Sequence, residues 1–265
     1  MSSETRSDIS SPVASPLPAT TFEFDDYDMS AFLSVVSRFG TEKYGYVATP
    51  NVDGLVRAYE SASFRETYSR AAFVLLDSRV AALLFRLVHG IRIPVLPGSD
   101  LTAILFREVI KPEDPVVLIG ANAEQAQELR ERFGLKNLFH HAPPMGFIHD
   151  SAAVEQCLKF VEANSPFRYC LIAVGDPQGM ILAHLLAERG SARGLAFNIG
   201  ASIDFITGKQ RRAPRWMQRL ALEWLYRLSS NPRRMASRYL IRGPKFLAYV
   251  GRSNIVRRTV PANAR

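Results

Sequence analysis

Cysteine, long apolar segments and, toward the C-terminus, acidic residues are scarce in this sequence. Only Cys157 and Cys170 occur among 265 residues, too few for a disulfide framework, and their apolar surroundings favour buried, reduced thiols. No segment approaches the roughly 18 apolar residues of a membrane-spanning helix, and the first residues lack the basic-then-apolar pattern of a signal peptide. We therefore expect a chain that works in a reducing compartment, the cytoplasm, and does not cross a bilayer.

Acidic residues are distributed unevenly along the chain. Residues 209–265 hold 15 Lys and Arg but a single acid, Glu223, whereas residues 1–208 hold 18 Lys and Arg against 24 Asp and Glu. The net charge of +8 therefore describes a mildly acidic body with a strongly basic C-terminal segment. Such asymmetry predicts an anionic partner at one end, and a solvated basic face is the simpler alternative.

The remaining composition, 47% hydrophobic and 22% charged residues, is typical of a globular protein and excludes a mostly disordered chain. From Tyr46 onward, short apolar runs alternate with helical periods, which predicts an α/β fold with a mostly parallel sheet covered by helices. The expected strands are 72–76, 115–119, 169–174 and 195–199. The expected helices cover 80–88, 123–133 and a third stretch ending at Glu188; Asn122 and Gln125 predict a capping box for the second.

Polar residues and glycines follow each expected strand, at Asp77, Gly120, Gly175–Gln178 and Gly200–Asp204. Ligands of open parallel sheets bind beyond the carboxyl ends of the strands, so these residues are candidates for one shared crevice. At this stage Asp77 fits a helix cap as well as it fits catalysis. The glycines fit tight turns as well as they fit phosphate contacts.

Beyond Gly208 the periodicity is purely helical. Apolar residues between Met217 and Leu228 recur at i, i+3, i+4 and i+7, which predicts one amphipathic helix starting near Pro214. A second helix is expected after Asn231, with a short third piece over 245–250 following Gly243-Pro244. Arginines repeat every four residues on the second helix: Arg234, Arg238 and Arg242. Basic amphipathic helices suit an anionic lipid surface or closure over an anionic ligand.

Several common catalytic motifs do not fit. Seven residues separate Gly200 from Gly208, where a phosphate-binding P-loop has four, and no Gly-x-Ser-x-Gly elbow occurs. His140 and His141 are adjacent, so a strand or helix would not aim both at one metal. We expect no metal site and no cofactor.

A long segment near the C-terminus resembles a known family. The matching residues are Asn198-Ile-Gly-Ala-Ser-Ile-Asp-Phe-Ile-Thr-Gly-Lys-Gln-Arg-Arg-Ala-Pro-Arg-Trp-Met217, Leu222-Glu-Trp-Leu-Tyr-Arg-Leu228, Asn231-Pro-Arg-Arg234 and Arg238-Tyr239. The pattern resembles the signature of the WecG/TagA/CpsF glycosyltransferases, bacterial enzymes that extend lipid-linked sugars while building teichoic acids, enterobacterial common antigen, capsules and exopolysaccharides. Further motifs follow the family's order, so the resemblance covers roughly residues 46–250: Thr49-Pro-Asn51, Leu76-Asp77, Gly98-Ser-Asp-Leu101 and Pro143-Pro-Met-Gly-Phe147.

The resemblance implies a Rossmann-like core and an inverting, metal-independent reaction. A sugar would pass from a UDP-sugar donor to a monosaccharide on undecaprenyl diphosphate, with Asp77 as general base. The other residues expected to bind the substrates are Thr49, Asn51, Asp100, Gly200, Asp204, Arg227, Arg234 and Arg238. Gln178 is expected to join them, because Gly179 stands where the family has a pocket glutamine and Gln178 would replace it from one position away. Bidentate guanidinium contacts suit the donor's diphosphate, and a carboxylate within reach of the attacking hydroxyl suits a single displacement.

We therefore predict four parts: a disordered tail (1–28), a Rossmann-like catalytic domain (29–208), a basic helical membrane-binding appendage (209–250) and a C-terminal tail (251–265). The resemblance also implies a peripheral protein on the cytoplasmic face of the inner membrane. A homo-oligomer is a further expectation.

Three loops differ from the family's usual sequence: Asp77-Ser78, Val95-Leu-Pro97 and Pro177-Gln-Gly-Met180. They motivate a second hypothesis, a non-catalytic relative that binds nucleotide sugar and scaffolds a polysaccharide assembly complex. A third hypothesis, nucleic-acid binding, depends on the basic segment alone; we expect no nucleic-acid partner, because no recognition motif accompanies the arginines.

Overall fold

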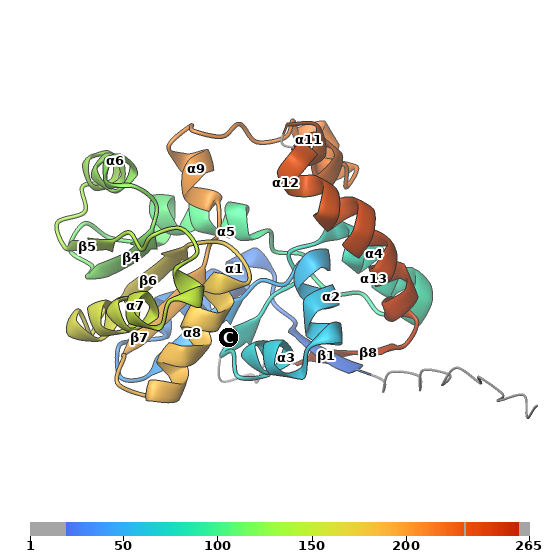
Figure 1. The fold of residues 1–265 in the computed structure, drawn as a ribbon, viewed down its shortest axis with the longest axis horizontal. Coiled ribbons are helices and arrows are strands. Elements are labelled where there is room, and N and C mark those ends of the chain that lie inside the picture. Colours follow the sequence, from blue (N-terminus) through green and yellow to red (C-terminus); the bar gives the residue numbers. More distant parts are fainter. Residues whose placement is uncertain (1–19, 231, 260–265) are drawn as a thin grey trace, which may run out of the picture.

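A computed structural model describes residues 20–230 and 232–259 of the chain. Its centre is a six-stranded sheet in the order β3-β2-β7-β6-β4-β5, with every neighbouring pair parallel (Figure 1). The strands are β2 Tyr44–Ala48, β3 Phe73–Val74, β4 Val116–Gly120, β5 Leu138–His141, β6 Tyr169–Ala173 and β7 Gly194–Asn198. The mixed α/β prediction with a parallel sheet is confirmed.

Helices cover both faces of this sheet. Alternate residues of β4 and β6 belong to two separate apolar clusters, as the two-residue period of a strand requires. On one face the helices are α2 Val52–Glu60, α3 Ala62–Ser69, α4 Arg79–His89, α7 Ser151–Ala163 and α8 Gln178–Arg189. On the other they are α1 Met29–Arg38, α5 Gly98–Ile104, α6 Ala123–Phe133 and α9 Ser202–Ile206. Two short segments complete this part: the π-helical η1 Leu105–Val109 and the 3₁₀ turn η2 Phe147–His149.

Local signals placed several elements correctly. Helix α6 has the predicted capping box, in which Asn122 Oδ1 accepts from Gln125 N at 2.8 Å and Gln125 Oε1 accepts from Asn122 N at 3.2 Å. Gly134 ends the helix with a φ of 64°, a conformation that glycine adopts without strain. The four expected strands correspond to β3, β4, β6 and β7. Strands β2 and β5 were not predicted.

Both ends of the described chain differ from the predicted tails. Strand β1, Thr20–Asp25, pairs in parallel with β8, Ser253–Arg258, in a second, two-stranded sheet. Phe22, Phe24 and Ile255 are buried on its inner face, with exposed fractions of 6%, 1% and 3%. The predictions of loose tails through residue 28 and from 251 onward are therefore wrong for these stretches, because each strand needs a partner more than 200 residues away.

The basic segment is helical, but its breaks differ from the prediction. The helices are α10 Arg215–Arg219, α11 Glu223–Ser230, α12 Pro232–Ala236, the π-helical η3 Ser237–Arg242 and α13 Gly243–Val250. The single helix expected from Pro214 is interrupted at Ala221, whose φ is +59°. Gly243 has helical dihedrals, so η3 runs into α13 without the predicted break. Across the described ranges, no helix is long and apolar enough to span a membrane.

Candidate active site

The carboxyl ends of β2 and β3 open into a cavity of about 350 Å³, which the C-terminal helices close from the other side. Two segments distant in sequence therefore share it: the loops after β2 and β3 with α4, and the stretch from α10 to α13. Its polar lining consists of Asn51, Asp53, Asp77, Ser78, Arg79, Gln218, Glu223, Arg227 and Tyr239. Its apolar lining includes Val80, Leu84, Trp224, Phe246 and Leu247. The volume lies within the range of small-molecule sites.

Asp77 stands where β3 gives way to α4. Its backbone N–H donates to Pro50 O at 2.9 Å, which fixes the strand end against the loop after β2. The cap of α4 is made by Ser78, whose Oγ accepts from Ala81 N at 3.1 Å. The capping role considered for Asp77 therefore belongs to its neighbour, and the half-buried Asp77 lines the cavity instead.

Thr49 and Asn51 follow β2, at the same edge of the sheet as Asp77; Asn51 lines the cavity and Thr49 lies outside its lining. A Cβ placed on Gly98 would lie 3.3 Å from Thr49 Oγ1 and 3.7 Å from Asp77 Oδ2, so both side chains converge on the start of α5. Asn51 Oδ1 caps α2, accepting from Asp53 N at 3.1 Å and Gly54 N at 3.3 Å. This cap fixes the amide plane of Asn51 and directs its nitrogen away from the helix, in a side chain that lines the cavity.

Arg227 reaches the cavity from α11. Its Nε donates to Glu223 Oε1 at 2.9 Å, and its guanidinium lies 5.6 Å from the centroid of the Phe205 ring on α9. Burial acts to lower the pKa of Arg227, but the Glu223 carboxylate, Tyr239 and Asp77 raise the pKa above its ordinary value. Asp77 and Arg227, 150 residues apart, thus act on each other across one site.

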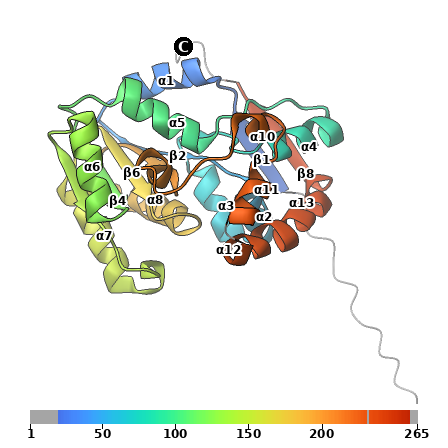
Figure 2. The same cartoon turned by 90° about the horizontal axis from the view of Figure 1, so that it is seen from above.

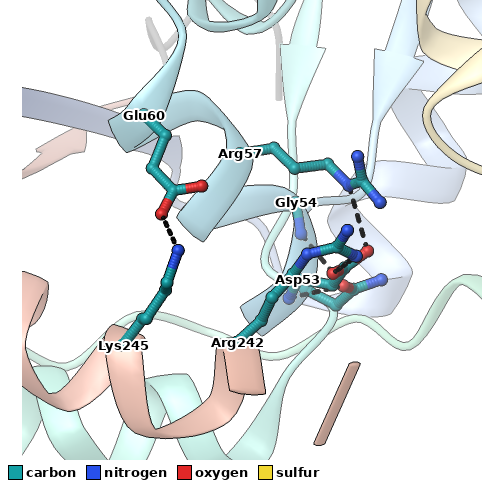
Figure 3. A network of polar contacts seen from close by, with 7 residues as sticks. Asp53, Gly54, Arg57, Glu60, Arg242 and Lys245 are labelled. Atoms are coloured by element: carbon teal, nitrogen blue, oxygen red, sulfur yellow. Dashed lines mark hydrogen bonds and ion pairs between the residues drawn. The ribbon is translucent and has the colours of Figure 1, made fainter. Parts of the chain in front are cut away.

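Two cationic side chains hold the C-terminal helices against α2, the helix that Asn51 caps (Figure 3). The buried Asp53 carboxylate pairs with Arg242 Nη1 at 2.5 Å and with Arg57 Nε at 3.2 Å. Lys245 Nζ pairs with Glu60 Oε1 at 2.7 Å. These contacts set the position of η3 and α13 over the cavity.

Other predicted residues lie outside the cavity lining. Asp100 forms an ion pair with Arg212, and Asp204 Oδ1 accepts from Gln125 Nε2 at 2.9 Å, which ties α9 to α6. Gly200 and Gln178 follow β7 and β6, so they lie along the same edge of the sheet as Asp77 without lining the cavity. For Arg234 and Arg238 the side chains fall outside the described part of the structure.

Packing explains why residues 177–180, at the start of α8, differ from the family's usual sequence. A Cβ on Gly179 would lie 2.3 Å from Asn198 Oδ1, so only glycine allows the first turn of α8 to approach the end of β7 this closely. The amide of Asn198 in turn donates to the Asp176 carboxylate. A glutamine side chain at position 179 does not fit this arrangement.

Sequence reasoning did not select Glu223, Tyr239 or Asp53 as site residues. A signal existed for Glu223, the lone acid of residues 209–265. Tyr239 lay within the matched Arg238-Tyr239 motif, whereas nothing local distinguished Asp53, whose pairing with Arg242 depends on how the C-terminal helices fold back on the sheet. Within residues 20–230 and 232–259, no group of three or more His, Cys, Asp or Glu side chains is arranged to hold a metal ion.

A parallel α/β sheet whose strand ends supply a carboxylate, closed by arginine-bearing helices, is an arrangement suited to an enzyme with an anionic substrate. The sequence model of the glycosyl transferase WecG/TagA/CpsF family matches residues 18–260 of the 265-residue chain. The chain belongs to this family of glycosyltransferases, which act in cell-surface polysaccharide biosynthesis.

Proposed function

We propose that the protein is an inverting glycosyltransferase that moves a sugar from a UDP-sugar to a monosaccharide carried on undecaprenyl diphosphate. The observation that carries this proposal is the meeting of Asp77 and Arg227 in one cavity. A single displacement needs one base beside the acceptor hydroxyl and positive charge beside the departing diphosphate.

In this reaction the acceptor hydroxyl attacks the anomeric carbon of the donor sugar. A new carbon–oxygen bond forms on the face opposite the departing UDP, the bond to the β-phosphate oxygen breaks, and the hydroxyl proton passes to the Asp77 carboxylate. The guanidinium of Arg227 stabilises the charge that grows on UDP, and the amide nitrogen of Asn51 and the Thr49 hydroxyl supply hydrogen bonds for a sugar. We propose that this reaction needs neither a metal ion nor a cofactor.

Arg234 and Arg238 belong to the same proposal through the family motif. They follow Arg227 along the chain, in α12 and η3, the helices that lead back over the cavity. We propose that with these arginines the C-terminal helices bind the donor's diphosphate and an anionic bilayer, and that the enzyme works on the cytoplasmic face of the inner membrane. We propose UDP-glucose and UDP-N-acetylhexosamines as the first donors to examine.

The test uses purified protein, a lipid-linked monosaccharide acceptor and a panel of UDP-sugars, with sugar transfer and UDP release measured separately. We expect transfer by the wild-type chain and a loss of at least about a hundredfold in Asp77→Asn, because the base is removed while the side-chain shape is kept. UDP affinity should be unchanged in this variant. The matched control is Glu124→Gln, an exposed carboxylate on α6.

Two outcomes would contradict the proposal. If Asp77→Asn transfers sugar at the wild-type rate, Asp77 is not the base. If the wild-type chain binds UDP but turns over no donor, the protein is instead a nucleotide-sugar-binding relative without catalysis.

A further inference from the structure

Exposed apolar side chains gather at one end of the molecule. Among the described residues, all the exposed large apolar side chains except Phe139 and Met145 lie on α4, α10, α11, η3, α13 or the turn after α10. Figures 1 and 2 both place α4, α11 and α13 together at the end of the molecule remote from α6, and Figure 1 shows β5 near α6. Helix α4 belongs to the sheet domain, yet Leu83 and Leu87 on it are 53% and 70% exposed.

Helices α4 and α13 pack directly against each other. The rings of Phe85 and Phe246 meet edge to face with centroids 6.0 Å apart, and His89 Nε2 donates to Val250 O at 2.7 Å. Leu247, one residue past Phe246, is 59% exposed. The exposed leucines of the two helices therefore border one surface.

This surface surrounds the mouth of the cavity. Trp224 and Leu247 are exposed and also line the cavity, so they stand at its opening. On α4, Val80 and Leu84 line the cavity, and Leu83 and Leu87 come next around the helix, on the outward side. An apolar path thus runs from the cavity wall to the outer surface.

Cations outnumber acids along this surface, although Glu60 of α2 pairs with Lys245 and Glu223 lines the cavity. No acid occurs between Asp77 and Asp100, a stretch with three arginines at 79, 86 and 92, and none occurs after Glu223. Arg79 and Arg86 are exposed beside the leucines of α4, and Lys245 is exposed on α13. Exposed leucines flanked by cations match an anionic bilayer, whereas pairing this face with a second copy would set like charges against each other.

We propose that α4 joins η3 and α13 in one docking surface for an anionic phospholipid bilayer, with the cavity mouth opening at the level of the headgroups. The basic C-terminal segment is then only half of the surface, and the catalytic domain supplies the other half. This inference rests on the proposed function, because a transferase for a lipid-linked acceptor must bring its cavity to the membrane. It explains why leucines on a helix beside Asp77 remain uncovered.

The experiment measures binding of the full chain to phosphatidylcholine vesicles with and without about 30% phosphatidylglycerol. The first variant is Leu87→Asp, matched by Met145→Asp, the same kind of apolar-to-acid change, with the same change in net charge, at a fully exposed site elsewhere. The second is Arg86→Glu, matched by Lys111→Glu, which changes the net charge equally at an exposed position before β4. We expect the leucine variant to weaken binding to the anionic vesicles about tenfold or more. We expect Arg86→Glu to weaken it severalfold and both controls to bind as the wild type does.

Other results would overturn the inference. If both α4 variants bind anionic vesicles as the wild type does, α4 is not part of the docking surface. If light scattering shows that the leucine variant converts an oligomer into a monomer without changing vesicle binding, the face joins copies of the chain instead. UDP affinity measured without vesicles reports on the proposed function separately, so the two ideas can fail independently.

Discussion

At the scale of single residues, the pairing of Arg227 with Glu223 is the feature with the clearest chemical consequence. Without a ligand, the guanidinium facing the cavity is neutralised by the only acid of the basic segment. A diphosphate that binds Arg227 must compete with this carboxylate. The pair is partly exposed, so the competition is modest, about 0.2–1 kcal/mol by comparison with exposed ion pairs.

Glu223→Gln should therefore tighten UDP binding, by about two- to fivefold, because Arg227 loses its ion-paired carboxylate. Arg227→Lys should weaken it, since a lysine cannot make the bidentate contact. Titration calorimetry with UDP checks both. A weaker Kd for Glu223→Gln would show that the carboxylate orients Arg227 for the donor rather than competing with it.

Gly179 offers a second prediction at this scale. Gly179→Ala should lower the free energy of unfolding by about 1–3 kcal/mol, because its Cβ would lie 2.3 Å from Asn198 Oδ1. Chemical denaturation measures the loss. In an Asn198→Ala background the same substitution should cost less, since the clashing atom is gone; equal costs in both backgrounds would refute the explanation.

At the scale of elements, the C-terminal helices are held to the sheet domain by aromatic as well as ionic contacts. Tyr59 on α2 and Tyr249 on α13 stack with ring centroids 4.1 Å apart, and the Tyr249 hydroxyl donates to Glu60 at 3.0 Å. Lys245 lowers the pKa of the Glu60 carboxyl by hydrogen bonding to it, against the effect of burial, and Tyr249 lowers it further. Helix α2 therefore has a cavity residue, Asn51, as its N-cap and also carries the helices that close the cavity.

Strand β5 gives a prediction about pH. His141 stacks on Phe160 of α7, and its Nε2 is buried without a hydrogen-bond partner among the described residues. Burial lowers the pKa of His141 below its ordinary 6.5, and His140 lowers it further by a smaller amount. As the pH falls, His141 in the unfolded chain therefore takes up a proton at a higher pH than His141 in the folded chain. The stability that neutral His141 gives is present above pH 6.5 and is lost as the pH falls through the lower pKa of the folded state.

The wild-type chain should accordingly lose more unfolding free energy between about pH 7.5 and pH 5.5 than His141→Phe, which keeps the stack but cannot titrate. Urea denaturation at the two pH values measures this difference. Equal losses in the two proteins would mean that His141 does not titrate differently on folding.

At the scale of the whole molecule, the two ends of the described chain meet in the β1–β8 sheet. The Asp25 carboxylate accepts from Val74 N at 2.7 Å and pairs with Arg258 at 2.7 Å, so it joins this small sheet to β3, the strand that leads to Asp77. The second sheet thus joins the two ends of the described chain and supports the strand that leads to Asp77.

Ile255→Ala should reduce the free energy of unfolding by about 2–4 kcal/mol, because it leaves a cavity in the buried face of β8. Asn254→Ala, at the exposed neighbouring position, should change it by less than about 0.5 kcal/mol. Thermal and chemical unfolding check both. Equal effects would contradict a folded β8.

The sequence determined the parts of this protein that depend on neighbouring residues. Caps and hydrophobic periods placed α6 and the inner strands, and the motif run after Asn198 identified the family, because these signals lie within a few residues of one another. The position of Asp77 at a strand end was equally local. That Ser78 rather than Asp77 caps α4 became clear only from the structure, in which Ser78 Oγ accepts from Ala81 N.

Only the tertiary structure decided what meets across the chain. The pairing of β1 with β8, the approach of Arg227 to Asp77 and the contact of α4 with α13 each join segments separated by 150 residues or more. The sequence of one segment does not specify which distant segment it will contact, because such contacts arise from the packing of complete layers. For the same reason the strong charge of the C-terminal segment, and closure over an anionic ligand as one of its uses, could be predicted in advance, whereas the leucines of α4 at the edge of the cavity could not.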